Sequence, residues 1–430
     1  MNRHVTRVLG AIAIALALPI GLHAADLSSQ PIGAISFAPK LIVDIKAKSM
    51  VGPSIQLDER NVAHVAWMEE DTNGRTVRYA HTTSPSSDSL TSSIPVNGPN
   101  DLPYWRQEAP ALDVRGNMVY IAWAKMPAVP VADKPFANEL RLSRSLDSGQ
   151  TFLPSAPIND DGEPVLHSFD SIRIDREGAI HVAWIDARGS KKNPGTYVSR
   201  STDHGITFDK NKKIDDDTCV CCRTSVAIAD DGTLYVAWRK VFGEVRETVV
   251  ARSFDGGLTF SEPVIVGNDK WVYPSCPHRP ASLGIDHEGR VYVVWYTEGE
   301  DETPAVYIAY SNDRGQTFSP KYQLNRSKGT FPDHPQLAVD GHGRVVAVWE
   351  ELSPVRREVV VSYSVDRGRT FSAPQKINEK KGEMPTIAVS PTGQFLLAWK
   401  EHAMPNHRIV LQRIALPELL PVAMETRTPQ

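Results

Sequence analysis

The feature that most constrains this chain is a short phrase that recurs seven times and always ends in tryptophan. In each copy an alternating strand leads through an Asp-x-x-Gly-like turn into a second apolar strand, which is the pattern of a β-hairpin. The copies follow one another at intervals of 50–61 residues, and a period of this length indicates a repeat architecture. The seven tryptophans are Trp67, Trp123, Trp184, Trp238, Trp295, Trp349 and Trp399.

A second phrase, Ser-x-Asp-x-Gly-x-Thr-Phe, follows the hairpin in five of the repeats. Its Asp side chain can accept hydrogen bonds from backbone N–H groups and its Gly can take the left-handed conformation, so it predicts a tight turn. The five copies span residues 145–152, 201–208, 253–260, 311–318 and 364–371. Residues 79–90 contain a degenerate copy, and no copy follows Trp399.

The second phrase resembles the Asp-box, or bacterial neuraminidase repeat, of the sialidase superfamily. This resemblance covers residues 35–416 and implies an all-β fold, a single β-propeller domain of four-stranded antiparallel blades. Seven repeats predict seven blades, with the six blades typical of sialidase catalytic domains as the alternative. The last repeat lacks an outer strand, and residues 35–45 are predicted to supply it and to close the ring.

The two ends of the chain are predicted to lie outside the propeller. A basic start, a 15-residue apolar run over residues 8–22 and a small residue at Ala24 indicate a signal peptide over residues 1–24. An uncleaved N-terminal anchor is the alternative. We therefore expect a secreted or periplasmic protein with no stable membrane span after cleavage, because no later apolar stretch is long enough to cross a bilayer. Residues 417–430, with three prolines, are predicted to be a flexible tail.

The charge of the chain argues against nucleic acid as a partner. The formal net charge is −4 and the pI is about 6.4, whereas a nucleic-acid-binding face requires a clear basic excess.

The sialidase resemblance also implies where a site would lie. Such propellers carry their pocket at the end of the axis where loops enter the inner strands and leave the tryptophan-terminated strands. Arginines in equivalent entering loops could grip an acidic ligand such as a carboxylate-bearing glycan, since a planar guanidinium binds a carboxylate in bidentate fashion. The candidate ligand-binding residues are Arg106, Arg223 and Arg279, with Arg239 in reserve, and the two tryptophans outside the repeat, Trp105 and Trp271.

By the same resemblance, catalysis would use a Tyr nucleophile helped by Glu and an Asp acid/base. The candidates are Tyr273 or Tyr296 beside Glu298 or Glu350, and Asp170 or Asp186. The Arg-Ile-Pro motif of the family is absent from the N-terminal region, where residues 36–41 read SFAPKL. Propellers also serve as binding modules, so a glycan-binding protein and a scaffold for protein partners remain alternative interpretations.

The four cysteines form a further candidate site, because all of them lie in two adjacent entering loops. They are Cys219, Cys221, Cys222 and Cys276. In an oxidising compartment a disulfide from one of the first three to Cys276 is one interpretation. A metal-binding or redox-linked site, with thiolates holding Cu or Zn either alone or together with His278, is the second interpretation. A reactive thiol is the third.

Overall fold

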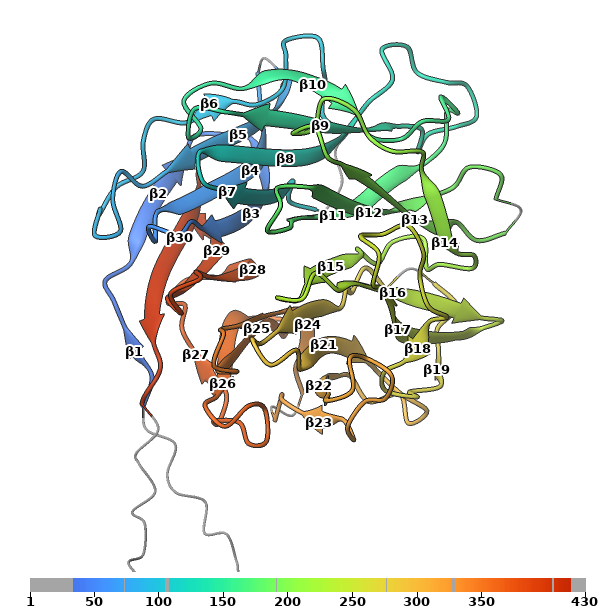
Figure 1. The fold of residues 1–430 in the computed structure, drawn as a ribbon. Coiled ribbons are helices and arrows are strands. Elements are labelled where there is room, and N and C mark those ends of the chain that lie inside the picture. The colour runs from blue at the N-terminus through green and yellow to red at the C-terminus, as the bar shows by residue number, and fades with distance from the viewer. Residues whose placement is uncertain are drawn as a thin grey trace, which may run out of the picture. The chain divides into compact units, whose positions relative to one another are not determined.

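Seven antiparallel sheets and no helix are formed by the described part of the chain (Figure 1). This computed structural model describes residues 34–418 except 73, 105–107, 191, 276, 327–328 and 404–405. All of them belong to one compact unit, Gly33–Gln430. The described residues contain no helix long and apolar enough to span a bilayer. The predicted signal peptide and residues 419–430 of the predicted tail lie outside the described residues.

Each sheet is one blade, and its strands follow one another from the inner to the outer edge. Blades 1 to 3 are β3 (Ser49–Leu57), β4 (Ala63–Asp71), β5 (Gly74–His81), β6 (Ile94–Pro95); β7 (Ala111–Arg115), β8 (Met118–Lys125), β9 (Glu139–Ser145), β10 (Leu153–Pro157); and β11 (His167–Ile174), β12 (Ile180–Asp186), β13 (Gly195–Ser201), β14 (Lys212–Asp215).

Blades 4 to 6 have the same order, and blade 4 carries one additional short strand, β19, paired with β17. They are β15 (Ser225–Ile228), β16 (Leu234–Phe242), β17 (Val245–Ser253), β18 (Val264–Ile265), β19 (Trp271–Val272); β20 (Ser282–Ile285), β21 (Val291–Thr297), β22 (Ala305–Ser311), β23 (Tyr322–Gln323); and β24 (Phe331–Val339), β25 (Val345–Leu352), β26 (Arg357–Ser364), β27 (Gln375–Lys376).

Blade 7 joins the two ends of the described chain. It consists of β28 (Gly382–Val389), β29 (Phe395–Ala403) and β30 (Asn406–Ala415), with β1 (Ser36–Phe37) and β2 (Leu41–Ile45) paired to the outer side of β30. The pairing aligns Ser36 with Ala415 and Leu41 with Leu411. The prediction that residues 35–45 supply the missing outer strand is therefore confirmed.

The inner strands close a ring. Consecutive inner strands β3, β7, β11, β15, β20, β24 and β28 contact one another, and β28 contacts β3 in turn. Figure 1 shows these strands facing the middle of the molecule, with the later strands of each blade farther out. The fold is thus an all-β, seven-bladed propeller of four-stranded antiparallel sheets, and of the two predicted blade counts seven is the one confirmed.

The seven repeated tryptophans are part of the buried core of the propeller. Each is at most 2% exposed, and each indole Nε1–H donates to a side-chain oxygen. A buried indole N–H requires such a partner. The acceptors, in chain order, are Glu69, Ser143, Asp186, Asp215, Asp269, Glu351 and Glu401. Four of these acids lie two residues after the tryptophan, in the same strand.

The five Ser-x-Asp-x-Gly-x-Thr turns share one hydrogen-bond pattern. In residues 145–152 the hydroxyl of Ser145 accepts from the N–H of Gly149 at 2.9 Å and donates to Asp147 at 2.6 Å. The Asp147 carboxylate also accepts from the N–H and the hydroxyl of Thr151. The same bonds recur at Ser201, Ser253, Ser311 and Ser364. The polar groups of the turn residues therefore hydrogen-bond to one another, as expected of a structural element.

Candidate functional site

A cavity of about 180 Å³ lies on the axis and is lined by residues from all seven inner strands or the loops that enter them. One level of this lining is a ring of seven equivalent positions, each paired with the residue that precedes the repeated tryptophan. Five of the seven carry a hydroxyl group. The ring comprises Ser54, Ala111, Ser171, Ser225, Ser282, Gln336 and Thr386.

Several of these hydroxyls join neighbouring blades. Ser171 Oγ and Thr224 Oγ1 lie 3.0 Å apart and form a hydrogen bond between blades 3 and 4. Ser225 Oγ accepts from the backbone N–H of Leu283 at 3.1 Å, and Ser282 Oγ accepts from the next blade. The ring therefore keeps adjacent inner strands in register and lines the cavity with polar atoms.

The loops just before the ring form the mouth of the cavity, and their backbone is bent. Four inner strands have a register shift two or three residues before the ring position. At these bulges Phe169, His334 and Met384 have φ values of 64°, 46° and 53°. Bulges re-aim side chains, and left-handed backbone at non-glycine residues is often found at functional sites. His334 and Met384 face the cavity, together with Glu108, Arg223 and His278.

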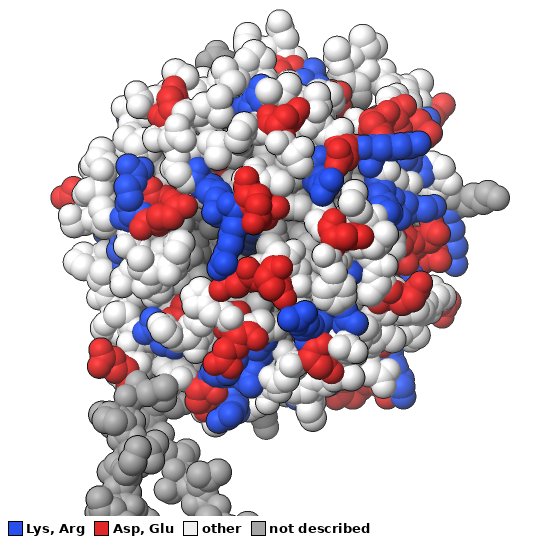
Figure 2. Space-filling view, viewed as in Figure 1, with Lys and Arg blue, Asp and Glu red and all other residues white. Residues whose placement is uncertain are grey.

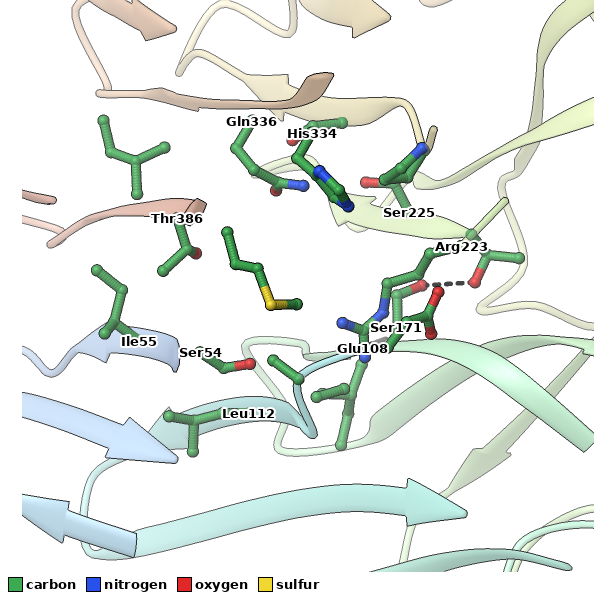
Figure 3. A pocket seen from close by; sticks show the side chains of 18 of the residues that line it. Ser54, Ile55, Glu108, Leu112, Ser171, Arg223, Ser225, His334, Gln336 and Thr386 are labelled. Atoms are coloured by element: carbon green, nitrogen blue, oxygen red, sulfur yellow. Dashed lines mark hydrogen bonds between the residues drawn. The ribbon is translucent and has the colours of Figure 1, made fainter. Parts of the chain in front are cut away.

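Arg223 is the predicted arginine that the structure places in the cavity. Its Nε–H donates to the backbone oxygen of Asp170 at 2.5 Å, which fixes the direction of the guanidinium group. Within the described residues, no protein acceptor takes a hydrogen bond from its two terminal nitrogens. Figure 3 shows the guanidinium beside Glu108 and Ser171 at the cavity wall.

Glu108 was not predicted from the sequence, although it lies in the same entering loop as Arg106. It retains some exposed area because it faces the cavity, but protein atoms surround its carboxyl group. Burial raises the pKa of Glu108 to about 8, with Asp170 and Cys222 adding to the shift and Arg223 opposing it. The carboxyl group therefore carries a proton at neutral pH.

His334 faces the same cavity and carries a positive charge. Burial lowers its pKa, but the carboxylates of Asp333 and Glu350 outweigh burial and raise it to about 9. Its Nδ1 lies 3.2 Å from Glu350 Oε1 and 3.3 Å from Asp333 Oδ1. The mouth thus combines two cationic groups, Arg223 and His334, with a protonated carboxyl group.

Asp170, a predicted acid/base, lies immediately behind this mouth. It is 5% exposed, its Oδ2 has no hydrogen-bond partner within the described residues, and burial raises its pKa. Its backbone oxygen orients Arg223. Its carboxyl group is not part of the cavity lining.

A second group of predicted residues forms a separate cluster between blades 4 and 5. The guanidinium of Arg239 lies 4.9 Å from the ring centroid of Trp271, and that of Arg279 lies 4.3 Å from the centroid of Tyr296. Arg239 donates to the backbone oxygens of Arg279 and Tyr296. None of these four residues lines the axial cavity.

The predicted nucleophiles lie in or next to this second cluster. The hydroxyl of Tyr296 donates to Glu298 at 2.5 Å, its side chain is fully buried, and burial raises its pKa. The ring centroid of Tyr273 lies 5.0 Å from that of Trp271. The catalytic roles of these residues remain predictions.

Two further predicted catalytic carboxylates are engaged in structural contacts. Asp186 is fully buried and accepts from Trp184 and from Arg188. Glu350 is 1% exposed, accepts from the backbone N–H of Met384 at 2.6 Å and pairs with His334. Glu350 therefore positions two residues of the cavity mouth.

Three of the four cysteines gather behind the cavity. Cys219, Cys221 and Cys222 are free, buried thiols, and their sulfur atoms lie within 4.8 Å of one another. His278 does not belong to this group of ligand atoms, but it lines both the axial cavity and a second cavity beside Cys221. Cys276 lies outside the described residues, as do Trp105 and Arg106, so the predicted disulfide to Cys276 stays a prediction.

Comparison with known proteins supports the fold. Neither a family model nor a curated protein matches this chain. A polysaccharide lyase, Uly1, is 11% identical with a TM-score of 0.54 over 86% of this chain and 91% of its own. A protein of unknown function from Dyadobacter fermentans DSM 18053 is 15% identical with a TM-score of 0.51 over 72% and 94%. The Hadza microbial sialidase Hz136 is 15% identical with a TM-score of 0.49 over 81% and 74%. The chain is therefore similar in fold to polysaccharide lyase Uly1 and to the Dyadobacter fermentans protein.

Proposed function

We propose that this chain is an exported propeller that binds a carboxylate-bearing sugar in its axial cavity and acts on it. The observation that carries the proposal is the guanidinium of Arg223, which is oriented by the backbone oxygen of Asp170 and has two terminal nitrogens that no described residue accepts from. A planar guanidinium binds a carboxylate through two parallel hydrogen bonds, and such charge-assisted bonds are about twice as strong as neutral ones.

The charges around the cavity favour an anionic ligand. His334 adds a second positive charge at neutral pH, whereas Glu108 is neutral because of its raised pKa. In a partly buried site the attraction between unlike charges is several times stronger than in bulk water. An anion entering the mouth therefore meets the guanidinium of Arg223 and the imidazolium of His334, which is also paired with Glu350 and Asp333.

The polar ring below the mouth suits sugar hydroxyl groups. Its serines and threonine can each donate and accept a hydrogen bond, and Gln336 offers both a donor and an acceptor. The cavity is smaller than the roughly 300–1,000 Å³ typical of pockets for drug-sized ligands. We therefore expect it to take a single terminal sugar unit of the sialic-acid or uronic-acid class.

Glu108 is the group best suited to donate a proton in the reaction. A general acid works best when its pKa lies near the working pH, and the pKa of Glu108 is raised to about 8. It also lies beside the arginine that would hold the ligand carboxylate (Figure 3). The fold shared with polysaccharide lyase Uly1 is consistent with this chemistry, but fold alone does not assign it.

The proposal is tested by offering the full chain sialosides and glucuronate-containing oligosaccharides and measuring binding by calorimetry and turnover by product release. We expect one of these acids to bind. Its neutral parent sugar should bind at least about ten-fold more weakly, because loss of the bonds to the guanidinium should cost at least about 1.4 kcal/mol of binding free energy, which is a factor of ten. Glu108→Gln should retain binding and lose turnover. Failure of every acidic sugar to bind at millimolar concentration would refute the proposal.

A further inference from the structure

A cluster of buried thiols lies outside the proposed sugar site. Cys219 Sγ is 3.6 Å from Cys222 Sγ and 4.0 Å from Cys221 Sγ, and all three sulfurs lie within 4.8 Å of one another. A disulfide requires sulfurs about 2.05 Å apart, so none of these pairs is bonded. Three sulfurs held about 2.3 Å from one metal ion in a flat triangle would be about 4.0 Å apart. The observed spacing is close to that of a three-sulfur metal site.

The three thiols are buried and pack against apolar side chains. Cys219, Cys221 and Cys222 are 2%, 3% and 0% exposed. They pack with Leu166, Phe169, Ile185 and Val241 in one hydrophobic cluster. Soft sulfur donors in such an environment select Cu(I) or Zn over hard cations.

A buried arginine beside the cluster has hydrogen-bond donors that no described residue accepts. Arg239 is 3% exposed, and its Nε and Nη1 have no hydrogen-bond partner within the described residues. The Nε of Arg246 is likewise buried and unpartnered. Buried guanidinium groups with unmet donors are expected only where a negative charge is present, and metal-bound thiolates supply that charge.

The cluster also has an access route. A second cavity, of about 470 Å³ and largely apolar, is lined by Cys221, Val220 and Phe136. Val220 and Phe136 are 41% and 55% exposed, so this cavity opens near the surface. A metal site requires such a route as well as its ligands.

We propose that Cys219, Cys221 and Cys222 form a three-coordinate site for Cu(I). Cu(I) is a soft cation that suits thiolate ligands, and Cys219, Cys221 and Cys222 are the three thiols that the described residues bring together. Binding replaces thiol protons with the metal, and Arg239 and Arg246 offset part of the negative charge that results. The site lies directly behind the axial cavity, because Cys222 precedes Arg223 in the chain and its sulfur affects the pKa of Glu108.

The test uses the full chain, reduced with a phosphine under anaerobic conditions, in a Cys276→Ser background. This background leaves three thiols and prevents a disulfide to Cys276. Titration with Cu(I) against a competing chelator should show one tightly bound equivalent, and X-ray absorption should show three sulfur neighbours at about 2.3 Å. The same absorption measurement on the unmodified chain keeps the test valid if the background variant folds poorly. Substoichiometric binding, or a nitrogen and oxygen shell, would overturn the proposal.

Two variants and one control assign the ligands. Cys222→Ser and Cys219→Ser should each weaken Cu(I) binding by more than the roughly 10–100-fold typical of losing a supporting residue. Val220→Ala, in the same loop but without sulfur, should leave the affinity unchanged. Equal affinity in all three variants, or tighter binding of Zn(II) than of Cu(I), would contradict the assignment.

Discussion

The indole Nε1 of Trp184 donates a 2.8 Å hydrogen bond to Oδ2 of Asp186, and the same carboxylate accepts from the backbone N–H and the guanidinium of Arg188. Both the indole and the carboxylate are fully buried. An acid two residues after the tryptophan, in the same strand, therefore completes the core of its blade. The same relationship links Trp349 to Glu351 and Trp399 to Glu401.

Asp186→Asn should destabilise the fold without changing ligand binding. The amide keeps the shape of the side chain but removes the charge that Arg188 and Trp184 share, and hydrogen bonds to charged groups contribute about 1.5–3 kcal/mol each. We expect the free energy of unfolding to fall by about 2–4 kcal/mol, measured by urea denaturation. Asp216→Asn, whose side chain is 73% exposed, is the control and should change it by less than about 0.5 kcal/mol. A loss of turnover with unchanged stability would instead show that Asp186 is catalytic.

The repeat turns should behave as structural elements that depend on ionised aspartates. Replacing Ser311 or Asp313 by Ala should cost about 1 kcal/mol each, as does the loss of comparable side-chain caps on backbone N–H groups. Asp88→Asn, in the degenerate first copy, is the matched control because the described residues give its side chain no hydrogen bond. Equal effects of Asp313→Ala and Asp88→Asn on thermal unfolding would contradict this account.

The same turns predict loss of stability in acid. Hydrogen bonds within the turn lower the pKa of Asp147 to about 2, with the bond from Ser145 the largest contribution, and the pKa of Asp313 is also lowered to about 2. A carboxylate with a depressed folded-state pKa stabilises the fold above its unfolded pKa of about 4. This stability is lost as pH falls from about 4 to about 2. The midpoint of urea unfolding, measured over that range, should fall with pH in the wild type and fall less in Asp313→Ala.

Removing residues 35–45 should open the ring at blade 7. These residues contain β1 and β2, which cover the outer edge of β30, and an uncovered edge strand pairs readily with other chains. The shortened chain should aggregate in sedimentation experiments and unfold at lower temperature. Asp44→Ala, which breaks only the exposed ion pair with Arg408, serves as the control and should sediment like the unmodified chain. A shortened chain as stable as the full one would show that β30 needs no partner.

Affinity for an acidic sugar should fall as pH rises from 7 to 10. The ligand carboxylate stays ionised over this range, so the change comes from the protein. Glu108 ionises near pH 8 beside Arg223, and His334 loses its charge near pH 9. Each step should weaken binding by about ten-fold, the effect of one charge in a partly buried site. Glu108→Gln should shift the onset of the fall from about pH 8 to about pH 9, measured by calorimetry, and an unshifted onset would exclude Glu108 as its cause.

The fold was predictable from the sequence because each blade is specified by a short local sequence pattern, and this pattern is repeated. Each tryptophan phrase encodes one hairpin, so counting the phrases counts the blades, and the missing outer strand of the last repeat pointed to residues 35–45. The positions of the ring hydroxyls are encoded by the same register, since each ring residue pairs with the residue before a tryptophan. Single serines such as Ser171 and Ser282 nevertheless look like ordinary strand residues until the ring brings them together.

The site was predictable only in part. Arg223 and His278 belong to entering loops that the sequence singles out, and both reach the cavity. Arg279 and Tyr296 belong to equally suggestive segments, but they stack against each other away from the axis. The direction in which the entering loops point their side chains depends on bulges such as the one at His334. These bulges follow from three-dimensional packing and not from local sequence. The position of Glu108, three residues before β7, was the available signal for its role.

The central claim is that Arg223 holds the carboxylate of a bound sugar, and one thermodynamic cycle tests it most directly. Calorimetry gives the affinities of the wild type and of Arg223→Gln for an acidic sugar and for its neutral methyl ester. We predict that the wild type prefers the acid by at least about ten-fold. This preference should disappear in Arg223→Gln, because it arises from the interaction between Arg223 and the carboxylate of the sugar. An equal preference for the acid in both proteins would contradict the account.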